Sequence, residues 1–118
     1  MKTFLAVYTG SEASRIRSGW DELDDDERSA REQAGMQAWG EWMQANADAI
    51  VDTGGPLGKT KRISRDGVAD TSNELAGYVI LRAASHAEAA ARFAAHPHFA
   101  IFPGDAVEVM ECLPIPEV

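Results

Sequence analysis

Two of the three histidines stand close together near the carboxyl end of the sequence, at His96 and His98 on either side of a proline. A neutral imidazole accepts or releases a proton readily near pH 7, so either residue could act as a general base. A structural role is the alternative, because both follow an alanine-rich segment and a histidine at a helix carboxyl end interacts favourably with the helix dipole. The His-x-His spacing has no third ligand nearby in sequence, so we expect no metal site.

Glu108 is the carboxylate most clearly set in an apolar segment. Strand alternation places its side chain on the same face as Ala106, Met110 and Cys112. A carboxylate in such surroundings would have a raised pKa and could exchange protons. A buried ion pair or an exposed strand end would explain Glu108 equally well.

Aromatic side chains could form the walls of an apolar pocket beside these groups. Trp39 and Trp42 lie in a predicted helix and Tyr78 in a predicted strand, although core aromatics at helical spacing need no ligand. Gly55 and Pro56 follow a further glycine, where backbone amides and a tight turn could contact a ligand, but the phosphate-loop spacing is missing. The sequence carries no dinucleotide fingerprint and no Cys-x-x-Cys pair, so we expect no cofactor.

Two predicted strands are apolar on both faces. Alternating residues of Thr3–Tyr8 and of Leu75–Leu81 are apolar or aromatic throughout, as in strands that are covered on both sides. We therefore expect both strands to lie centrally in a sheet with cover on each face.

Two predicted helices and two further strands connect these central segments. A helix over Asp26–Asp52 follows from apolar residues at helical spacing, an acidic entrance and a Gly-Gly-Pro stop. A second helix begins at Ser85, in capping-box spacing with Glu88, and ends at His96-Pro97. The remaining strands are a polar one over Leu57–Ser64 and the last one over Ala106–Leu113.

The predicted order is strand, helix, strand, strand, helix, strand, which is the split βαβ arrangement of ferredoxin-like α+β domains. Two helices would pack on one face of a four-stranded antiparallel sheet. They cannot cover the other face, so we expect a homodimer in which a second copy covers it.

The composition is that of an ordinary globular protein, with 45% hydrophobic and 25% charged residues in 118 positions. Such a chain can close one core, so we expect a single domain over residues 1–118. A formal net charge of −8 repels nucleic-acid phosphates and anionic membrane surfaces, so neither is an expected partner. The short apolar start predicts no signal peptide and no membrane span, and we expect a cytoplasmic protein.

Five short motifs follow one another along the chain: Gly54-Gly55-Pro56-Leu57, Asp66-Gly67, Glu74-Leu75-Ala76-Gly77-Tyr78, His96-Pro97-His98 and Val107-Glu108-Val109. In this order they resemble the YCII-related proteins and their DGPF-like relatives, over nearly the whole chain. The resemblance implies a dimeric α-β barrel. It also implies a small-molecule cleft between the first helix and the sheet or at the dimer seam.

The sequence departs from this family at its suspected catalytic pair, a histidine on the first helix and an aspartate near that helix's end. The histidine's region holds Trp39 and Trp42, and only the aspartate has a match, in Asp48 or Asp52. The Asp-Gly turn is followed by Val-Ala rather than Pro-Phe. Of this pair, only the aspartate is therefore a candidate catalytic residue, and we take it to be Asp52.

Two functions remain open. One is a cofactor-independent enzyme, an isomerase, lyase or hydrolase, whose proton carriers are drawn from His96, His98, Asp52 and Glu108. The other is a non-catalytic binding or accessory module that holds a small molecule in the same cleft. An imidazole and a carboxylate within hydrogen-bond reach in an open pocket would favour the enzyme. A filled cavity, or a histidine bonded to a backbone carbonyl, would favour the module.

Overall fold

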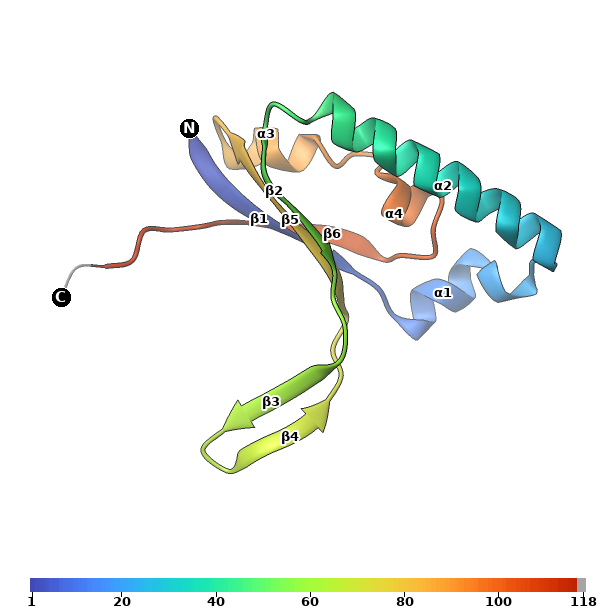
Figure 1. Cartoon of the computed structure of the whole chain (residues 1–118), viewed down its shortest axis with the longest axis horizontal. Helices are drawn as coiled ribbons and strands as arrows, with labels where there is room; N and C mark the ends of the chain where they lie inside the picture. Colours follow the sequence, from blue (N-terminus) through green and yellow to red (C-terminus); the bar gives the residue numbers. More distant parts are fainter. Residues whose placement is uncertain (117–118) are drawn as a thin grey trace.

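A computed structural model describes residues 1–116, and its centre is a four-stranded antiparallel sheet in the order β2-β5-β1-β6 (Figure 1). The strands are β1 (Lys2–Thr9), β2 (Ile50–Pro56), β5 (Leu75–Ala83) and β6 (Ala106–Glu111). The two predicted two-faced strands, β1 and β5, pair with each other in the middle of the sheet. This confirms the predicted α+β fold with a ferredoxin-like sheet.

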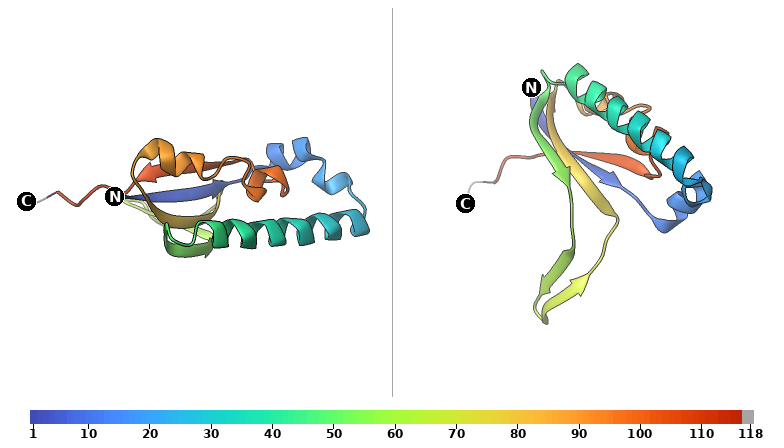
Figure 2. Two further views of the ribbon diagram at one scale, coloured as in Figure 1. Left: turned by 90° about the horizontal axis from the view of Figure 1, so that it is seen from above. Right: turned by 45° about the vertical axis from the view of Figure 1, so that its right-hand side comes forward.

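The helices lie on one side of this sheet, as Figures 1 and 2 show for α2, α3 and α4. They are α1 (Glu12–Ser18), the short 3-10 helix η1 (Trp20–Glu22), α2 (Asp25–Ala45), α3 (His86–Ala91) and α4 (Pro97–Ala100). Within residues 1–116 none of them combines the length and the apolar character that crossing a membrane requires. We call the sheet face beneath these helices the covered face, and the opposite one the open face.

The core lies on the covered face. Phe4 and Ala6 of β1 stand opposite Leu81 and Val79 of β5, and all four side chains are fully enclosed. Phe93, which follows α3, packs into the same cluster. Burying such side chains supplies most of the favourable free energy of folding.

Helix α2 begins where the acidic run predicts, because Asp24 accepts the Glu27 N–H at 2.8 Å and Glu27 completes a capping box. It ends at Ala45, so the predicted helix over Asp26–Asp52 is too long. Asn46 ends it by donating its side-chain amide to the Trp42 carbonyl at 2.8 Å while its side-chain oxygen accepts from Arg92. This cap depends on a tertiary contact that helical periodicity does not reveal.

Strand β2 occupies the segment that was predicted to end the helix. Gly54 does have a left-handed backbone, with φ of 62°, but it serves a strand irregularity rather than a helix cap. A side chain at Gly54 would collide with the Tyr78 carbonyl, so glycine is required where β2 passes β5.

The second predicted helix is also shorter than expected, since α3 ends at Ala91. Ser85 caps it by accepting the Glu88 N–H at 3.1 Å, whereas the Glu88 carboxylate accepts from Ala84 rather than from Ser85. The chain then turns through Ala95, the one residue other than glycine with positive φ in the described part of the chain. His96 therefore lies outside α3 instead of at its end.

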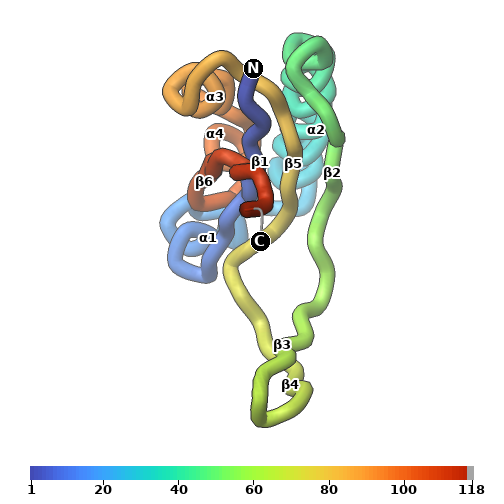
Figure 3. Tube along the Cα trace, turned by 90° about the vertical axis from the view of Figure 1, so that its left-hand side faces the viewer, coloured from blue at the N-terminus to red at the C-terminus, as the bar shows by residue number. Residues whose placement is uncertain are grey.

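The predicted strand over Leu57–Ser64 does not join the main sheet. Its second half forms β3 (Thr60–Ser64), which pairs only with β4 (Gly67–Thr71) in a separate two-stranded hairpin. Figure 3 shows this hairpin projecting beyond the sheet, away from the helices. We call residues 59–71 the arm.

Candidate functional site

A cavity of about 380 Å³ lies where α2 passes over the β2 and β5 side of the covered face. This volume is near the lower end of the range for small-molecule pockets and would hold one substituted ring. The residues that line it come from six segments of the chain and are Tyr8, Met36, Trp39, Thr53, Gly55, Pro56, Ala76, Gly77, Tyr78, His98 and Phe102.

The cavity wall is almost entirely apolar. Its only ionisable side chains are those of Tyr8, Tyr78 and His98, and no carboxylate, lysine or arginine lines it in the part of the chain described. A phosphorylated or multiply charged ligand would lose its hydration here without gaining a counter-charge. The wall therefore suits a neutral, largely apolar molecule.

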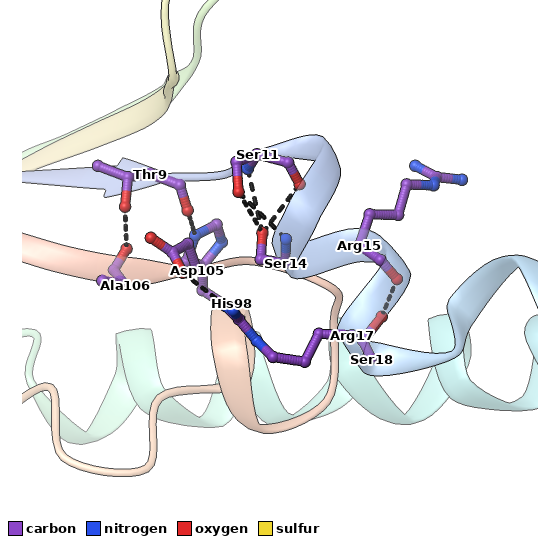
Figure 4. Close-up of polar contacts among 9 residues, drawn as sticks. All are labelled: Thr9, Ser11, Ser14, Arg15, Arg17, Ser18, His98, Asp105 and Ala106. Atoms are coloured by element: carbon purple, nitrogen blue, oxygen red, sulfur yellow. Dashed lines mark hydrogen bonds and ion pairs between the residues drawn. The ribbon is translucent and has the colours of Figure 1, made fainter.

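His98 is held in one tautomer. Its Nε2 lies 2.7 Å from the Thr9 carbonyl oxygen (Figure 4). Because a carbonyl can only accept, Nε2 must carry the hydrogen. Burial lowers the pKa of His98, against smaller opposing effects of the Thr9 carbonyl and Asp105, so the ring is neutral at pH 7. A neutral ring with hydrogen on Nε2 has a lone pair on Nδ1, and within residues 1–116 no protein donor occupies it.

The surroundings of His98 fix the position of its ring. The Thr9 carbonyl also accepts the Asp105 N–H at 2.9 Å, and Arg17 pairs with the Asp105 carboxylate at 3.2 Å (Figure 4). Gly104 packs so closely that a Cβ there would overlap the His98 ring. The ring is thus anchored by a strand end and covered by a glycine.

His96 is enclosed and does not line the cavity. Its Nδ1 accepts the His98 backbone N–H at 3.0 Å, so it caps the start of α4 and not the end of a preceding helix. Burial, with His98 adding to the effect, lowers the pKa of His96 from 6.5 to about 4. Its Nε2 is buried without a partner in the described structure. His96 is therefore a neutral support beneath His98 and has no direct access to a ligand.

Tyr8 contributes an aromatic surface between the two histidines. Its ring centroid lies 5.2 Å from that of His96 and 5.2 Å from that of His98. Burial raises the pKa of Tyr8 to about 12, so its hydroxyl stays protonated. That hydroxyl is enclosed and has no hydrogen-bond partner among the described residues.

The structure brings together some of the predicted site residues. His98, Trp39, Gly55, Pro56 and Tyr78 all line the cavity. Trp39 also packs its ring edge-on against His96, with centroids 4.6 Å apart, so it belongs to the core and to the wall at once.

Three other predicted site residues lie elsewhere. Glu108 pairs across the sheet with Val7 on the open face and is exposed, so the expected apolar surroundings are not found within the single chain. Asp52 is exposed on β2, where its carboxylate accepts the Gly54 N–H at 2.8 Å. Trp42 packs on Phe93 and donates its indole N–H to the Arg92 carbonyl at 2.7 Å, so it is a core residue.

Several lining residues, including Met36 and Phe102, were not among the predicted site residues. Met36 is exposed at 67% and Phe102 lies in the loop before β6, and neither follows a motif. Phe102 reaches the cavity because Gly35 of α2 leaves room for its ring. Only the helical spacing of Met36 and Trp39 could have indicated that both face the same space.

Among residues 1–116, no group of three histidine, cysteine or acidic side chains is arranged to hold a metal ion. The structure also answers the two questions that separate an enzyme from a binding module. The cavity is open, but His98 is bonded to a backbone carbonyl, and none of the described residues that line the cavity is a carboxylate.

The fold resembles that of a solved enzyme, 5-chloro-2-hydroxyhydroquinone dehydrochlorinase (TftG) from Burkholderia phenoliruptrix AC1100 in complex with 2,5-dihydroxybenzoquinone. The TM-score is 0.52 and the sequence identity 16%, over 92% of this chain and 90% of that chain. At this identity the likeness shows a shared fold alone. No family model matches the sequence, and no curated protein matches it.

Proposed function

We propose that the protein is a cofactor-independent enzyme that moves a proton on a small, neutral, planar organic molecule, with His98 Nδ1 as the base. One observation carries this proposal: a neutral imidazole, fixed in one tautomer by the Thr9 carbonyl, lines an apolar cavity. The carbonyl bond is the feature expected of a binding module, but it also suits a base, because it orients the ring and leaves the second nitrogen free.

The lining also limits the class of substrate. A proton removed from the substrate leaves a negative charge, and among the residues the structure describes no lysine or arginine lines the cavity to stabilise it. The substrate must therefore spread this charge over its own atoms, as a phenol or an enol does. Trp39, Phe102 and Tyr8 provide flat surfaces for such a ring.

The step is a reversible proton transfer. The lone pair on His98 Nδ1 takes a proton from a ring hydroxyl or from a carbon next to a carbonyl, and the bonding electrons stay on the substrate. Burial disfavours the resulting imidazolium, so the proton returns to another substrate atom or leaves with an anionic group. These outcomes are an isomerisation and an elimination, respectively.

The structural neighbour supports the choice of probe. It is an enzyme that acts on a chlorinated hydroxyhydroquinone and was captured with a dihydroxybenzoquinone. Hydroxyhydroquinone is a neutral, planar phenol of the size that the cavity would hold, so it is the probe we would use.

A binding or accessory module is the second candidate. It is favoured by the absence of a carboxylate from the lining residues described, since a general base commonly works beside an oriented acid. The two candidates differ in one measurable respect, because a module binds the probe without exchanging its protons.

The test is deuterium exchange into the ring C–H positions of hydroxyhydroquinone in anaerobic D₂O, followed by ¹H NMR. We expect the wild-type protein to accelerate this exchange and His98→Gln to lower the rate by roughly 10²–10⁴. Glu108→Gln is the matched control, because Glu108 lies on the open face, and it should exchange like wild type. Quenching of tryptophan fluorescence measures binding in the same samples.

Each result has a distinct meaning. Quenching without exchange would overturn the enzyme and leave the module. Neither quenching nor exchange with hydroxyhydroquinone would overturn the proposed substrate class. Equal exchange by wild type and His98→Gln would remove His98 from the mechanism.

We further propose that the protein is cytoplasmic and that its working form is a homodimer, the homodimer being what the resemblance to the YCII-related proteins implies. The open face supports this, since Leu5, Tyr78 and Ile80 are only half-buried there and Met110 is exposed at 41%. A second copy whose open face meets this one would cover them.

A further inference from the structure

The arm is the least supported element of the fold. Every residue from position 61 to 71 is exposed, and the hairpin shares no strand pairing with the main sheet. A two-stranded hairpin alone in water is at best marginally stable. The arm therefore needs a contact outside this chain to hold its shape.

The arm also leaves the chain less compact than its length predicts. A compact domain of this length would have a radius of gyration of about 13 Å, whereas the observed radius is 16.4 Å. Figure 1 shows the arm turning to the side of the sheet away from α2, the side on which the chain also continues after β6. The arm and this segment thus flank the open face.

One face of the arm is apolar near its tip. Ile63 and Val68 stand opposite each other across the two strands and are 73% and 66% exposed. Further along the same face Lys61 pairs with Asp70. A pair of branched side chains at the end of a projecting ribbon is suited to packing against another surface.

The charge of the arm points to the kind of partner. Residues 59–71 hold four basic and two acidic residues, so the arm carries +2 while the rest of the chain carries −10 of the total of −8. Two such chains repel each other as a whole, but the arm of one is attracted to the body of the other. A second copy of this chain therefore complements the arm better than a basic partner would.

We infer that each arm clasps a second copy of the chain, with Ile63 and Val68 packed on the partner and the net positive charge of the arm facing the partner's acidic body. The contact is isologous, so the two arms of a dimer embrace symmetrically. This inference rests on the proposed homodimer and adds to it the element that holds the two copies together.

The experiment measures the dissociation constant by light scattering and analytical ultracentrifugation over a dilution series. We expect the double variant Ile63→Ser/Val68→Ser to weaken association at least tenfold, because it removes two apolar side chains from the contact. Ala69→Ser is the matched control on the opposite face of the same hairpin and should associate like wild type. Hydrogen exchange of the arm amides should slow as the dimer fraction rises.

The outcomes separate this inference from the proposals it rests on. A dimer with the same dissociation constant in wild type and the double variant, and fast exchange of arm amides, would overturn the arm contact alone. A wild-type monomer at all concentrations would overturn both the homodimer and the arm contact. The proton exchange assay with hydroxyhydroquinone tests the cavity independently of either result.

Discussion

The two faces of the sheet carry similar residues but have different surroundings. On the covered face Phe4 and Leu81 are completely enclosed by helices and neighbouring strands. On the open face Leu5 and Ile80, which alternate with them along the same strands, are only half-buried. Alternation along a strand thus predicts that both faces need cover, and the fold of one chain supplies it to one of them.

The ionisable candidates divide between the same two faces. His96 and His98 lie on the covered side, enclosed by aromatic rings. Glu108 and Asp52 are both exposed, and neither lines the cavity. Burial of a titratable group costs free energy unless it is neutral, which explains why the neutral imidazoles are inside and the carboxylates outside.

The largest expected difference between the faces is in stability. Phe4→Ala should lower the free energy of unfolding by about 3–5 kcal/mol, because it empties a fully enclosed site. Leu5→Ala should cost about 1 kcal/mol in the isolated chain, because the side chain is half-buried. Urea denaturation at a protein concentration below the dissociation constant of the dimer measures both losses. Equal losses would show that the two faces are equally packed.

A pH dependence of stability is expected from His96. Its pKa is about 4 in the folded chain against an ordinary value of 6.5, so the folded state binds fewer protons than the unfolded state between these values. The stabilisation is complete above pH 6.5, and roughly 3 kcal/mol of it is lost as the pH falls to about 4.

Denaturation curves recorded across this range test that expectation. His96→Asn keeps an acceptor at the start of α4 but removes the titrating ring, so its acid dependence should be shallower. An unchanged slope in the variant would show that His96 is not the titrating group.

Displacing the His98 ring without removing it should lower stability less than Phe4→Ala does. It should also clearly weaken ligand binding. Gly104→Ala introduces a methyl group against the ring and should cost about 1–3 kcal/mol. It should also abolish fluorescence quenching by hydroxyhydroquinone. Gly40→Ala, where a methyl group meets nothing, should keep wild-type quenching, and loss of quenching in both variants would contradict a specific effect at His98.

The smallest effects are expected for the carboxylates on the other side. Glu108→Gln and Asp52→Asn should each change the free energy of unfolding by less than about 0.5 kcal/mol, as exposed substitutions usually do. The thermal shift caused by hydroxyhydroquinone should be the same as in wild type. A reduced shift in either variant would place a carboxylate in the site after all.

The central place of the two-faced strands β1 and β5 was predictable from the sequence because it depends on local patterns, whereas the second strand of the sheet was predicted at Leu57–Ser64 and lies at Ile50–Pro56. The patterns that predict the two-faced strands and the Ser85 cap lie in residues adjacent in sequence, and the structure contains both features. The end of α2 was not predictable, because Asn46 caps it through a hydrogen bond with Arg92, a residue far along the chain. Gly54 was predicted to end a helix because glycine suits the left-handed backbone of a helix cap. A left-handed glycine suits a strand irregularity equally.

The cavity was predictable only in part, for a similar reason. Aromatic and histidine candidates stand out by residue type, and His98 and Trp39 do line the cavity. Met36 shares the helical spacing of Trp39, but Phe102 joins them only because α2 crosses the sheet at this place, which no local pattern records. The prediction that Glu108 lies in apolar surroundings was wrong, because an acid among apolar strand residues can face solvent on the uncovered side of the sheet.

The central claim is that His98 is neutral, carries its hydrogen on Nε2 and offers Nδ1 to a ligand. Nitrogen NMR of ¹⁵N-histidine-labelled protein measures this directly, with His86→Gln and His96→Asn used to assign the three histidines. We predict the Nε2–H form at pH 7 and a change in the Nδ1 resonance, with Nε2 still protonated, when hydroxyhydroquinone is added. A hydrogen on Nδ1 in the free protein, or an Nδ1 resonance that does not respond to the probe, would contradict the account.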